Sequence, residues 1–169
     1  MDVFEAIERR YSVRSYKPDP VEDEKLSRVL EAARQAPTAN NQQPFRILVV
    51  HTRGREEELQ RVYGRRWLTQ APLLIGFVAL PGEAWRRMDG KPYGEVDAAI
   101  AMDHLVLAAT ALGLGTCWIA AFDPAAAREV FGLPEEAELV ALTPLGYPGR
   151  GPAATSRRPL EELVRRERW

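Results

Sequence analysis

Arg10, Ser12 and Arg14 have the residue types and the spacing of an anion site. They lie two positions apart in the stretch RRYSVRSY, and side chains two positions apart in an extended chain project to the same side. Two guanidinium groups would then flank one hydroxyl, an arrangement that binds a phosphate or another planar anion through paired hydrogen bonds. A solvated basic segment is the alternative that these residues alone leave open.

Four carboxamides follow one another in the stretch PTANNQQPF, at positions 40–43. Each carries two donors and an acceptor, which suits the edge of a neutral heterocycle such as a flavin or a nucleobase. Asn, Thr and Pro also favour turns, so an ordinary polar surface loop is the alternative interpretation.

Other catalytic patterns are weak or missing. Gly113 and Gly115 lack the third glycine of a dinucleotide-binding fingerprint, and they stand between a helix and a strand, which is the wrong order for one. Neither GxSxG nor a Walker motif occurs. Cys117 is the only cysteine and lies in an apolar stretch, where a thiol is ordinarily an inert core group. A single cysteine excludes a disulfide within the chain. With His51 and His104 as the only imidazoles, a His/Cys zinc site is not expected either.

Side-chain periodicity predicts helices and strands that alternate along the chain. Leu26, Val29, Leu30 and Ala33 form an apolar stripe at helical spacing, whereas β-branched and aliphatic runs indicate strands. The interleaving predicts a layered α/β or α+β protein. The expected helices are 3–10, 21–35, 56–63, 96–112, 124–131 and 159–168, and the expected strands are 45–51, 73–80, 116–120 and 139–146.

Composition sets the broad class. A chain of 169 residues, 46% hydrophobic and 28% charged, is typical of one globular domain, so we expect residues 1–169 to form a single domain. A net charge of −1 argues against a broad nucleic-acid-binding surface. The opening MDVFEAIERR lacks the apolar stretch of a secretory signal, and no apolar run is long enough for a membrane span, so a cytoplasmic location is expected. The segment 96–112 is apolar around much of its circumference, which predicts central burial or contact with a second subunit.

Taken together, several segments resemble the nitroreductase family of FMN-dependent oxidoreductases. DVFEAIERRYSVRSY is similar to the family's opening helix and its RRSxR-type segment, and LEAARQAPTANNQQPF is similar to a helix followed by PSxxNxQPW. ALGLGTCWIAAFD, TPLGYP and RRPLEELV follow in the family's order, so the resemblance covers nearly the whole chain. It implies an α+β, nitroreductase-like fold with a central mixed β-sheet flanked by helices, in an intertwined homodimer with FMN at the interface.

The resemblance also implies roles for individual residues. Arg10, Ser12 and Arg14 match the segment that holds the FMN phosphate and ribityl region. Thr38, Asn41 and Gln43 match the loop that reaches the flavin from the partner subunit. Ala120 and Ala121 match positions beside the isoalloxazine ring, where the second usually offers its backbone N–H to flavin N5. Arg157, and after it Arg158, match a basic pair near the phosphate. Several positions depart from the family's usual residues, namely Thr38 for Ser, Phe45 for Trp, Ala121 for Gly and Thr155 for Lys.

The activity that the resemblance implies is reduction of nitroaromatics, quinones or similar acceptors by NADH or NADPH, through ping-pong hydride transfer at flavin N5. No catalytic side chain is expected, because the cofactor carries the chemistry. The alternatives are a non-catalytic flavin carrier or sensor, and a family member with reductive dehalogenase or flavin-fragmenting activity. No metal, nucleic-acid or membrane partner is expected.

Overall fold

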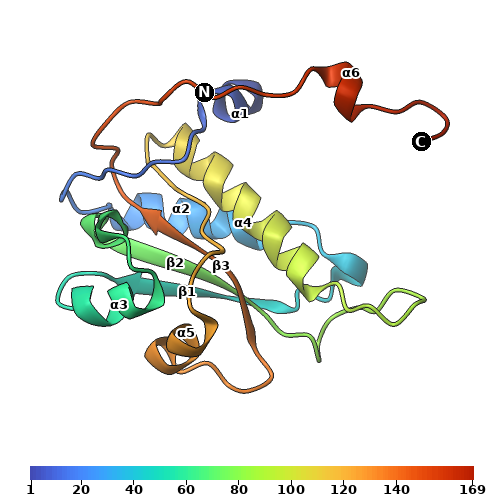
Figure 1. Ribbon diagram of the computed structural model, residues 1–169, viewed down its shortest axis with the longest axis horizontal. Coiled ribbons are helices and arrows are strands. Elements are labelled where there is room, and N and C mark those ends of the chain that lie inside the picture. Colours follow the sequence, from blue (N-terminus) through green and yellow to red (C-terminus); the bar gives the residue numbers. More distant parts are fainter.

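A computed structural model describes residues 1–169 as an α+β protein built on a three-stranded sheet (Figure 1). The strands β1 (Phe45–His51), β2 (Leu73–Ala79) and β3 (Glu138–Leu145) pair in the order β1-β2-β3, and both pairings are antiparallel. Parallel pairing, which a mixed sheet requires, is limited to an isolated bridge between Ser12 and Thr116. The central strand β2 is buried along its whole length, because helices cover both faces of the sheet.

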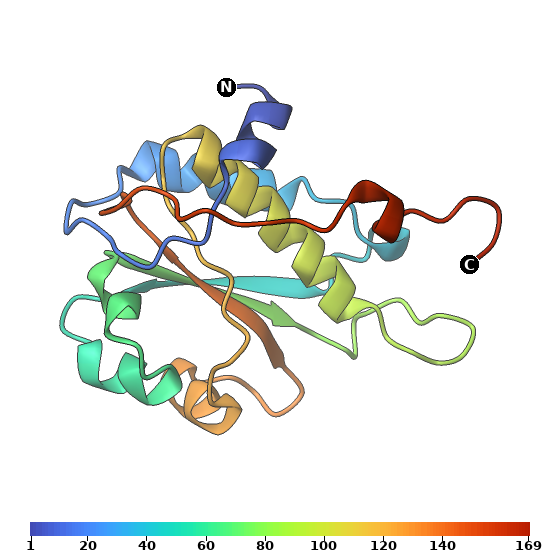
Figure 2. The same cartoon turned by 45° about the horizontal axis from the view of Figure 1, so that its top comes forward.

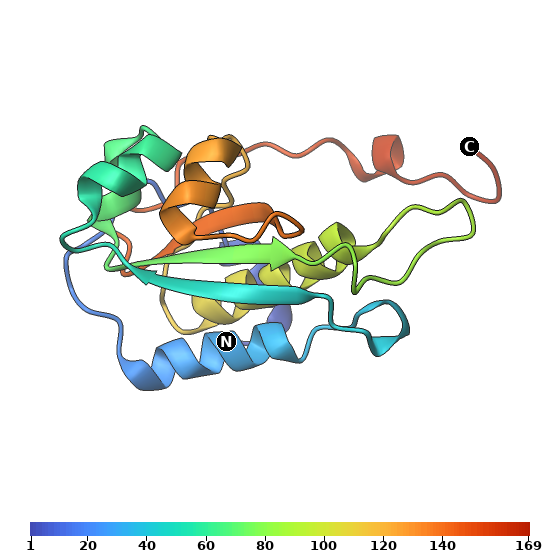
Figure 3. The same cartoon turned by 90° about the horizontal axis from the view of Figure 1, so that it is seen from below.

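The helices form one layer on each side of the sheet (Figure 3). Val29, Met102 and Leu105 belong to the core on one face, where α2 and α4 pack together, and Leu59 belongs to the core on the other face, where α3 and α5 lie. The helical elements are α1 (Val3–Arg9), α2 (Asp23–Arg34), η1 (Ala39–Asn41), α3 (Glu56–Val62), η2 (Arg66–Gln70), α4 (Gly94–Ala111), α5 (Pro124–Phe131) and α6 (Leu160–Leu163).

Local sequence signals explain where two of the helices begin. Asp2 and Glu5 form a reciprocal capping box at the start of α1. Asp123 accepts hydrogen bonds from two backbone amides at the start of α5, with Pro124 in the first turn, and Gly132 ends that helix in the left-handed conformation. The helices and strands expected from the sequence are confirmed within a few residues, apart from two segments.

The segment 116–120 does not form the expected strand. It has isolated bridges at Thr116 and Ile119, while the Cys117 N–H between them donates to the side-chain Oγ1 of Thr143 rather than to a neighbouring backbone. The regular backbone hydrogen bonding of a strand is therefore interrupted at Cys117.

The expected C-terminal helix 159–168 is also wrong in extent, since only Leu160–Leu163 is helical. Residues 151–169 are exposed, and the side chains of Leu160 and Leu163 lie largely in solvent. A helix this short is not stable without tertiary packing. The tail runs away from the body of the molecule (Figure 2). None of the helices has the length and apolar character that a membrane crossing requires.

Candidate functional site

The segment 10–14 and the C-terminal tail enclose a basic cavity of about 340 Å³. The Tyr11 hydroxyl donates to the Arg150 carbonyl at 2.7 Å, which holds the start of the tail against this segment. The cavity is lined by Arg10, Tyr11, Ser12 and Arg14 from one side and by Ala153, Thr155 and Arg157 from the other. The structure thus brings four of the expected site residues together from opposite ends of the chain.

The positive charge of this cavity is not neutralised by the chain itself. None of the seven ion pairs in the structure includes Arg10, Arg14 or Arg157. Three guanidinium groups that share a cavity without a carboxylate partner repel one another, and an anion with several acceptor oxygens would relieve that repulsion. The arrangement suits a phosphate group.

The segment 10–14 is held in place by the segment that follows α4. The Val13 N–H donates to the Thr116 carbonyl at 2.8 Å, so these two stretches run side by side. Arg10 and Ser12 consequently also line a second, smaller cavity of about 150 Å³, together with Cys117 and Trp118. The extended backbone after α4 is therefore brought beside the basic cluster.

The carboxamide loop has an unusual backbone. Asn40, Asn41 and Gln43 have φ values of 53°, 54° and 53°, in the left-handed region that residues with a side chain rarely adopt. The Gln43 N–H donates to Thr38 Oγ1 at 3.1 Å, and its side-chain amide donates to the Asn41 carbonyl at 3.1 Å. The loop is thus braced internally while the side chains of Asn41 and Gln43 stay exposed.

The loop and the basic cavity are not brought together within one chain. The loop is tied to the start of α4, where the Ala39 N–H donates to Asp97 Oδ1 at 2.9 Å. The basic cluster borders α4 at Asp103 and Val106. These positions are six to nine residues further along the helix, which corresponds to about 9 to 14 Å at 1.5 Å per residue.

Three other expected residues are exposed. Ala120 and Ala121 lie in the extended stretch before α5, two and three residues beyond Trp118, and their small side chains leave the backbone accessible. Arg158 is exposed and does not line the basic cavity, whereas the neighbouring Arg157 does.

Cys117 does not have the properties of a nucleophile. It is 3% exposed, and burial raises the pKa of its thiol, against opposing effects of the Arg14 charge and a hydrogen bond from Ser12. The protonated thiol is the unreactive form. The expectation of an inert core cysteine agrees with this environment.

Sequence reasoning missed Tyr11 and Asp97. Trp118 was considered from the sequence as one of four tryptophans that could stack on a cofactor, with core or interface packing as the ordinary explanation. Tyr11 adjoins expected site residues, but its aromatic group gave no signal beyond ordinary packing. Asp97 did offer one: it is an acid in an otherwise apolar stretch of α4, and it is 2% exposed. A buried acid in such a helix calls for a specific partner.

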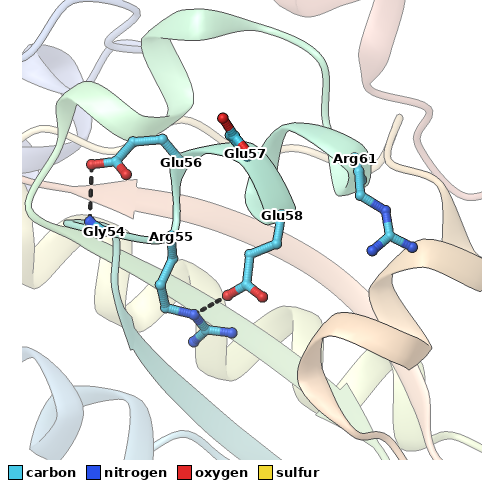
Figure 4. Close-up of a pocket in the computed structure, with 6 residues that line it drawn as sticks. All are labelled: Gly54, Arg55, Glu56, Glu57, Glu58 and Arg61. Atoms are coloured by element: carbon cyan, nitrogen blue, oxygen red, sulfur yellow. Dashed lines mark hydrogen bonds and ion pairs between the residues drawn. The ribbon is translucent and has the colours of Figure 1, made fainter.

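A different hollow, of about 570 Å³, lies over α3 (Figure 4). Arg55 pairs with Glu58 there, and Glu56 accepts the Gly54 N–H at 3.0 Å, so the charged groups partly satisfy one another. No residue expected to bind a ligand lies there. We interpret this hollow as a solvated charged surface.

Known structures share this fold. The structure of a nitroreductase family protein from Clostridium difficile 630 matches with a TM-score of 0.89 and 36% identity, over 100% of each chain. The antiparallel sheet between two helical layers is therefore the fold of a nitroreductase-type protein.

Sequence comparisons assign the family. The family model described as "Nitroreductase family" matches residues 7–64 and 54–147. The chain is 30% identical to the NADH dehydrogenase of Thermus thermophilus, over 97% of this chain and 95% of that protein. It is 28% identical to the FMN reductase [NAD(P)H] of Bacillus subtilis, over 99% of this chain and 74% of that protein. This chain belongs to the nitroreductase family.

Proposed function

We propose that this protein is an NAD(P)H-dependent FMN oxidoreductase that reduces small acceptors such as nitroaromatics and quinones. The observation that carries the proposal is the convergence of Arg10, Ser12, Arg14 and Arg157 on one cavity without carboxylate partners. Membership of the nitroreductase family and the likeness to an FMN reductase [NAD(P)H] support the choice of flavin and reductant.

The residues present fit an FMN phosphate. Arg10, Arg14 and Arg157 would neutralise its charge through paired hydrogen bonds, and the Ser12 hydroxyl would donate a further one. Arg158 would add positive charge from outside the cavity. We propose that Thr38, Asn41 and Gln43 contact the ring system through their hydroxyl and carboxamides, and that the backbone at Ala120 and Ala121 lies beside it.

When bound, FMN would supply the redox chemistry by taking a hydride from NAD(P)H at N5 and passing electrons to an acceptor. The contribution of the chain is to bind and orient the cofactor and to place donors around it. A backbone N–H at Ala121 would donate a hydrogen bond at N5. No side-chain acid or base is required for these steps, in keeping with the inert environment of Cys117.

A second copy of this chain is part of the proposal. Because the carboxamide loop lies about 9 to 14 Å along α4 from the basic cluster, we propose that a partner subunit supplies the loop. Exposed apolar side chains on α1 and the tail, including those of Phe4, Ile7, Leu160 and Leu163, support an intertwined homodimer in which each copy covers the other. Residues 1–169 would then act as a single FMN-binding domain in each subunit.

Reduction of the flavin by pyridine nucleotides tests the function directly. The purified protein, reconstituted with FMN, is mixed anaerobically with NADH or with NADPH while the flavin absorbance is followed. We expect bleaching with at least one reductant and reoxidation by nitro compounds or quinones. Failure to retain FMN contradicts the proposal, whereas tight retention without reduction favours the carrier or sensor alternative.

A further inference from the structure

Asp97 is a buried acid whose hydrogen bond leads out of its own helix. It lies in the first turn of α4 and is 2% exposed, and its Oδ1 accepts the Ala39 N–H at 2.9 Å. The positive end of the helix dipole favours a carboxylate at this position. The exposed Glu95 of the same turn would interact with the helix dipole equally well, so the burial of Asp97 requires another explanation.

The carboxamide loop requires support from outside. Its internal hydrogen bonds fix a shape in which Asn40, Asn41 and Gln43 hold left-handed backbone conformations, which Asn adopts more readily than other residues with a side chain and which are unfavourable for Gln43. Such conformations persist only where the surroundings hold them.

Two hydrogen bonds connect the loop to the body of the protein at its ends. The Leu80 N–H donates to the Pro44 carbonyl at 2.9 Å, which attaches the far end to the chain after β2. The Ala39 N–H and Asp97 attach the near end to α4. Of these two, only the second depends on a side chain.

The role of Asp97 as a hydrogen-bond acceptor can be tested separately from its negative charge, because only one of its two carboxylate oxygens has a partner. Oδ2 is buried and has no hydrogen-bond partner. Replacing Asp97 by Asn keeps a carbonyl oxygen for Ala39 and exchanges one unpartnered buried group for another. Replacing it by Ala removes the acceptor and leaves the Ala39 N–H unpaired.

We propose that Asp97 is a positioning residue that holds the carboxamide loop in its ligand-binding conformation through the Ala39 N–H; the effect on flavin affinity rests on the function proposed above. The acceptor oxygen at Oδ1 performs this role, and the negative charge does not. Asp97 itself does not contact the ligand.

The test compares D97A with D97N in two independent measurements on the full-length protein. Hydrogen exchange of the peptide that contains Ala39 reports the loop without any ligand, and titration with FMN reports the binding site. Glu95→Gln removes an exposed acid of the same helical turn. Val29→Ala opens a cavity between α2 and α4. It is the control for a variant that loses thermal stability but keeps the hydrogen bond between Asp97 and Ala39.

We expect D97A to lose protection at Ala39 and to bind FMN about ten- to a hundredfold more weakly, as the desolvation cost of the partly buried Ala39 N–H left without an acceptor predicts. We expect the FMN affinity of D97N to stay within about threefold of that of the wild type, because the acceptor oxygen for the Ala39 N–H is retained. E95Q and V29A bind FMN normally, with V29A melting at a lower temperature.

Unchanged protection and affinity in D97A overturn the positioning role, as does an equal loss in V29A. A loss in D97N as large as that in D97A overturns the assignment of the role to the acceptor oxygen. If the wild-type protein binds no FMN while Ala39 is protected only when residue 97 carries an acceptor, the proposed function fails and the positioning of the loop stands.

Discussion

Val13 leaves no room for a side chain at Gly115. A Cβ at position 115 would lie 2.7 Å from Val13 Cγ2 and 3.0 Å from Val13 Cβ, and it would also meet Pro148 at 3.1 Å. Because Val13 stands between Ser12 and Arg14, the close approach at Gly115 sets how near the segment 10–14 lies to the end of α4. The absence of a side chain at one position therefore helps to form the basic cavity.

Gly115→Ala should consequently destabilise the protein and weaken FMN binding together. Overpacking of this kind costs about 1 to 3 kcal/mol, and relief of the contact would displace segment 10–14. Thermal unfolding and FMN titration measure the two effects. Gly64→Ala is the matched control, since the nearest atom to a Cβ there is 3.9 Å away. Equal behaviour of the two variants would contradict this account.

Arg14→Gln should weaken binding of FMN but not of riboflavin. The guanidinium of Arg14 faces the cavity proposed for the phosphate, and riboflavin lacks that group. We expect an affinity loss of about tenfold or more, because hydrogen bonds to charged groups contribute about 1.5 to 3 kcal/mol. Added salt should weaken FMN binding by the wild type more than by the variant.

Fluorescence titrations with both flavins at low and high salt provide the measurement. Arg53→Gln serves as the control, since Arg53 precedes α3 and lines none of the cavities described here. A parallel loss of FMN and riboflavin binding in R14Q would place Arg14 against the ring system or in a purely structural role instead.

The sequence predicted elements whose causes are local. The apolar composition of residues 96–112 predicts a helix, and α4 occupies Gly94–Ala111 because a surface that is apolar around much of its circumference suits a helix between a sheet and its neighbours. Likewise, Asp123 and Pro124 predicted the start of α5 from neighbouring positions alone. These signals need no knowledge of the rest of the chain.

Features that depend on distant contacts could not be obtained in this way. Nothing near Cys117 indicates that its backbone amide is taken by the Thr143 hydroxyl, and this contact interrupts the expected strand. The meeting of Arg157 with segment 10–14 was suggested by family resemblance and not by spacing. The bond between Asp97 and Ala39 joins residues 58 positions apart. In each case the deciding partner lies elsewhere in the chain.

Cys117 should react slowly with alkylating reagents while the protein is folded. Burial raises the pKa of its thiol, so the fold favours the protonated form. This contribution to stability is fully present below the pKa of the unfolded chain, about 8.5, and it is lost as pH rises through the higher value of the folded state. Stability should therefore decline as the solution becomes alkaline.

Iodoacetamide labelling between pH 7.5 and 9.5, followed by mass spectrometry, measures this behaviour. Protein unfolded in guanidinium is the reference, and it should label rapidly at the alkaline end. Labelling of the folded protein at the rate of the unfolded chain would contradict the assignment of Cys117 as a buried, inert thiol.

Removal of residues 151–169 should weaken both the subunit contact and the cofactor site. The tail carries Arg157, which lines the basic cavity, and Leu160 and Leu163, which are 72% and 61% exposed in the isolated chain. Burial of these leucines against a second copy would stabilise the dimer by about 1.5 to 3 kcal/mol for each side chain. The dimer of the truncated protein should therefore dissociate at protein concentrations at which the full-length dimer is still intact. The truncated protein should also bind FMN more weakly.

Two variants separate these contributions. Arg157→Gln should lower FMN affinity and leave the dimer intact. The main effect of the double variant L160S/L163S should be a shift of the monomer–dimer equilibrium toward the monomer. Sedimentation velocity across a range of concentrations measures the equilibrium, with FMN titration at a concentration where each variant is dimeric. A wild-type protein that sediments as a 19.0 kDa particle at every concentration would exclude the homodimer and the role of the partner's loop with it. If the truncated protein instead dimerises like the wild type, the contact lies outside the tail, where Phe4 and Ile7 of α1 and Val96 of α4 are exposed.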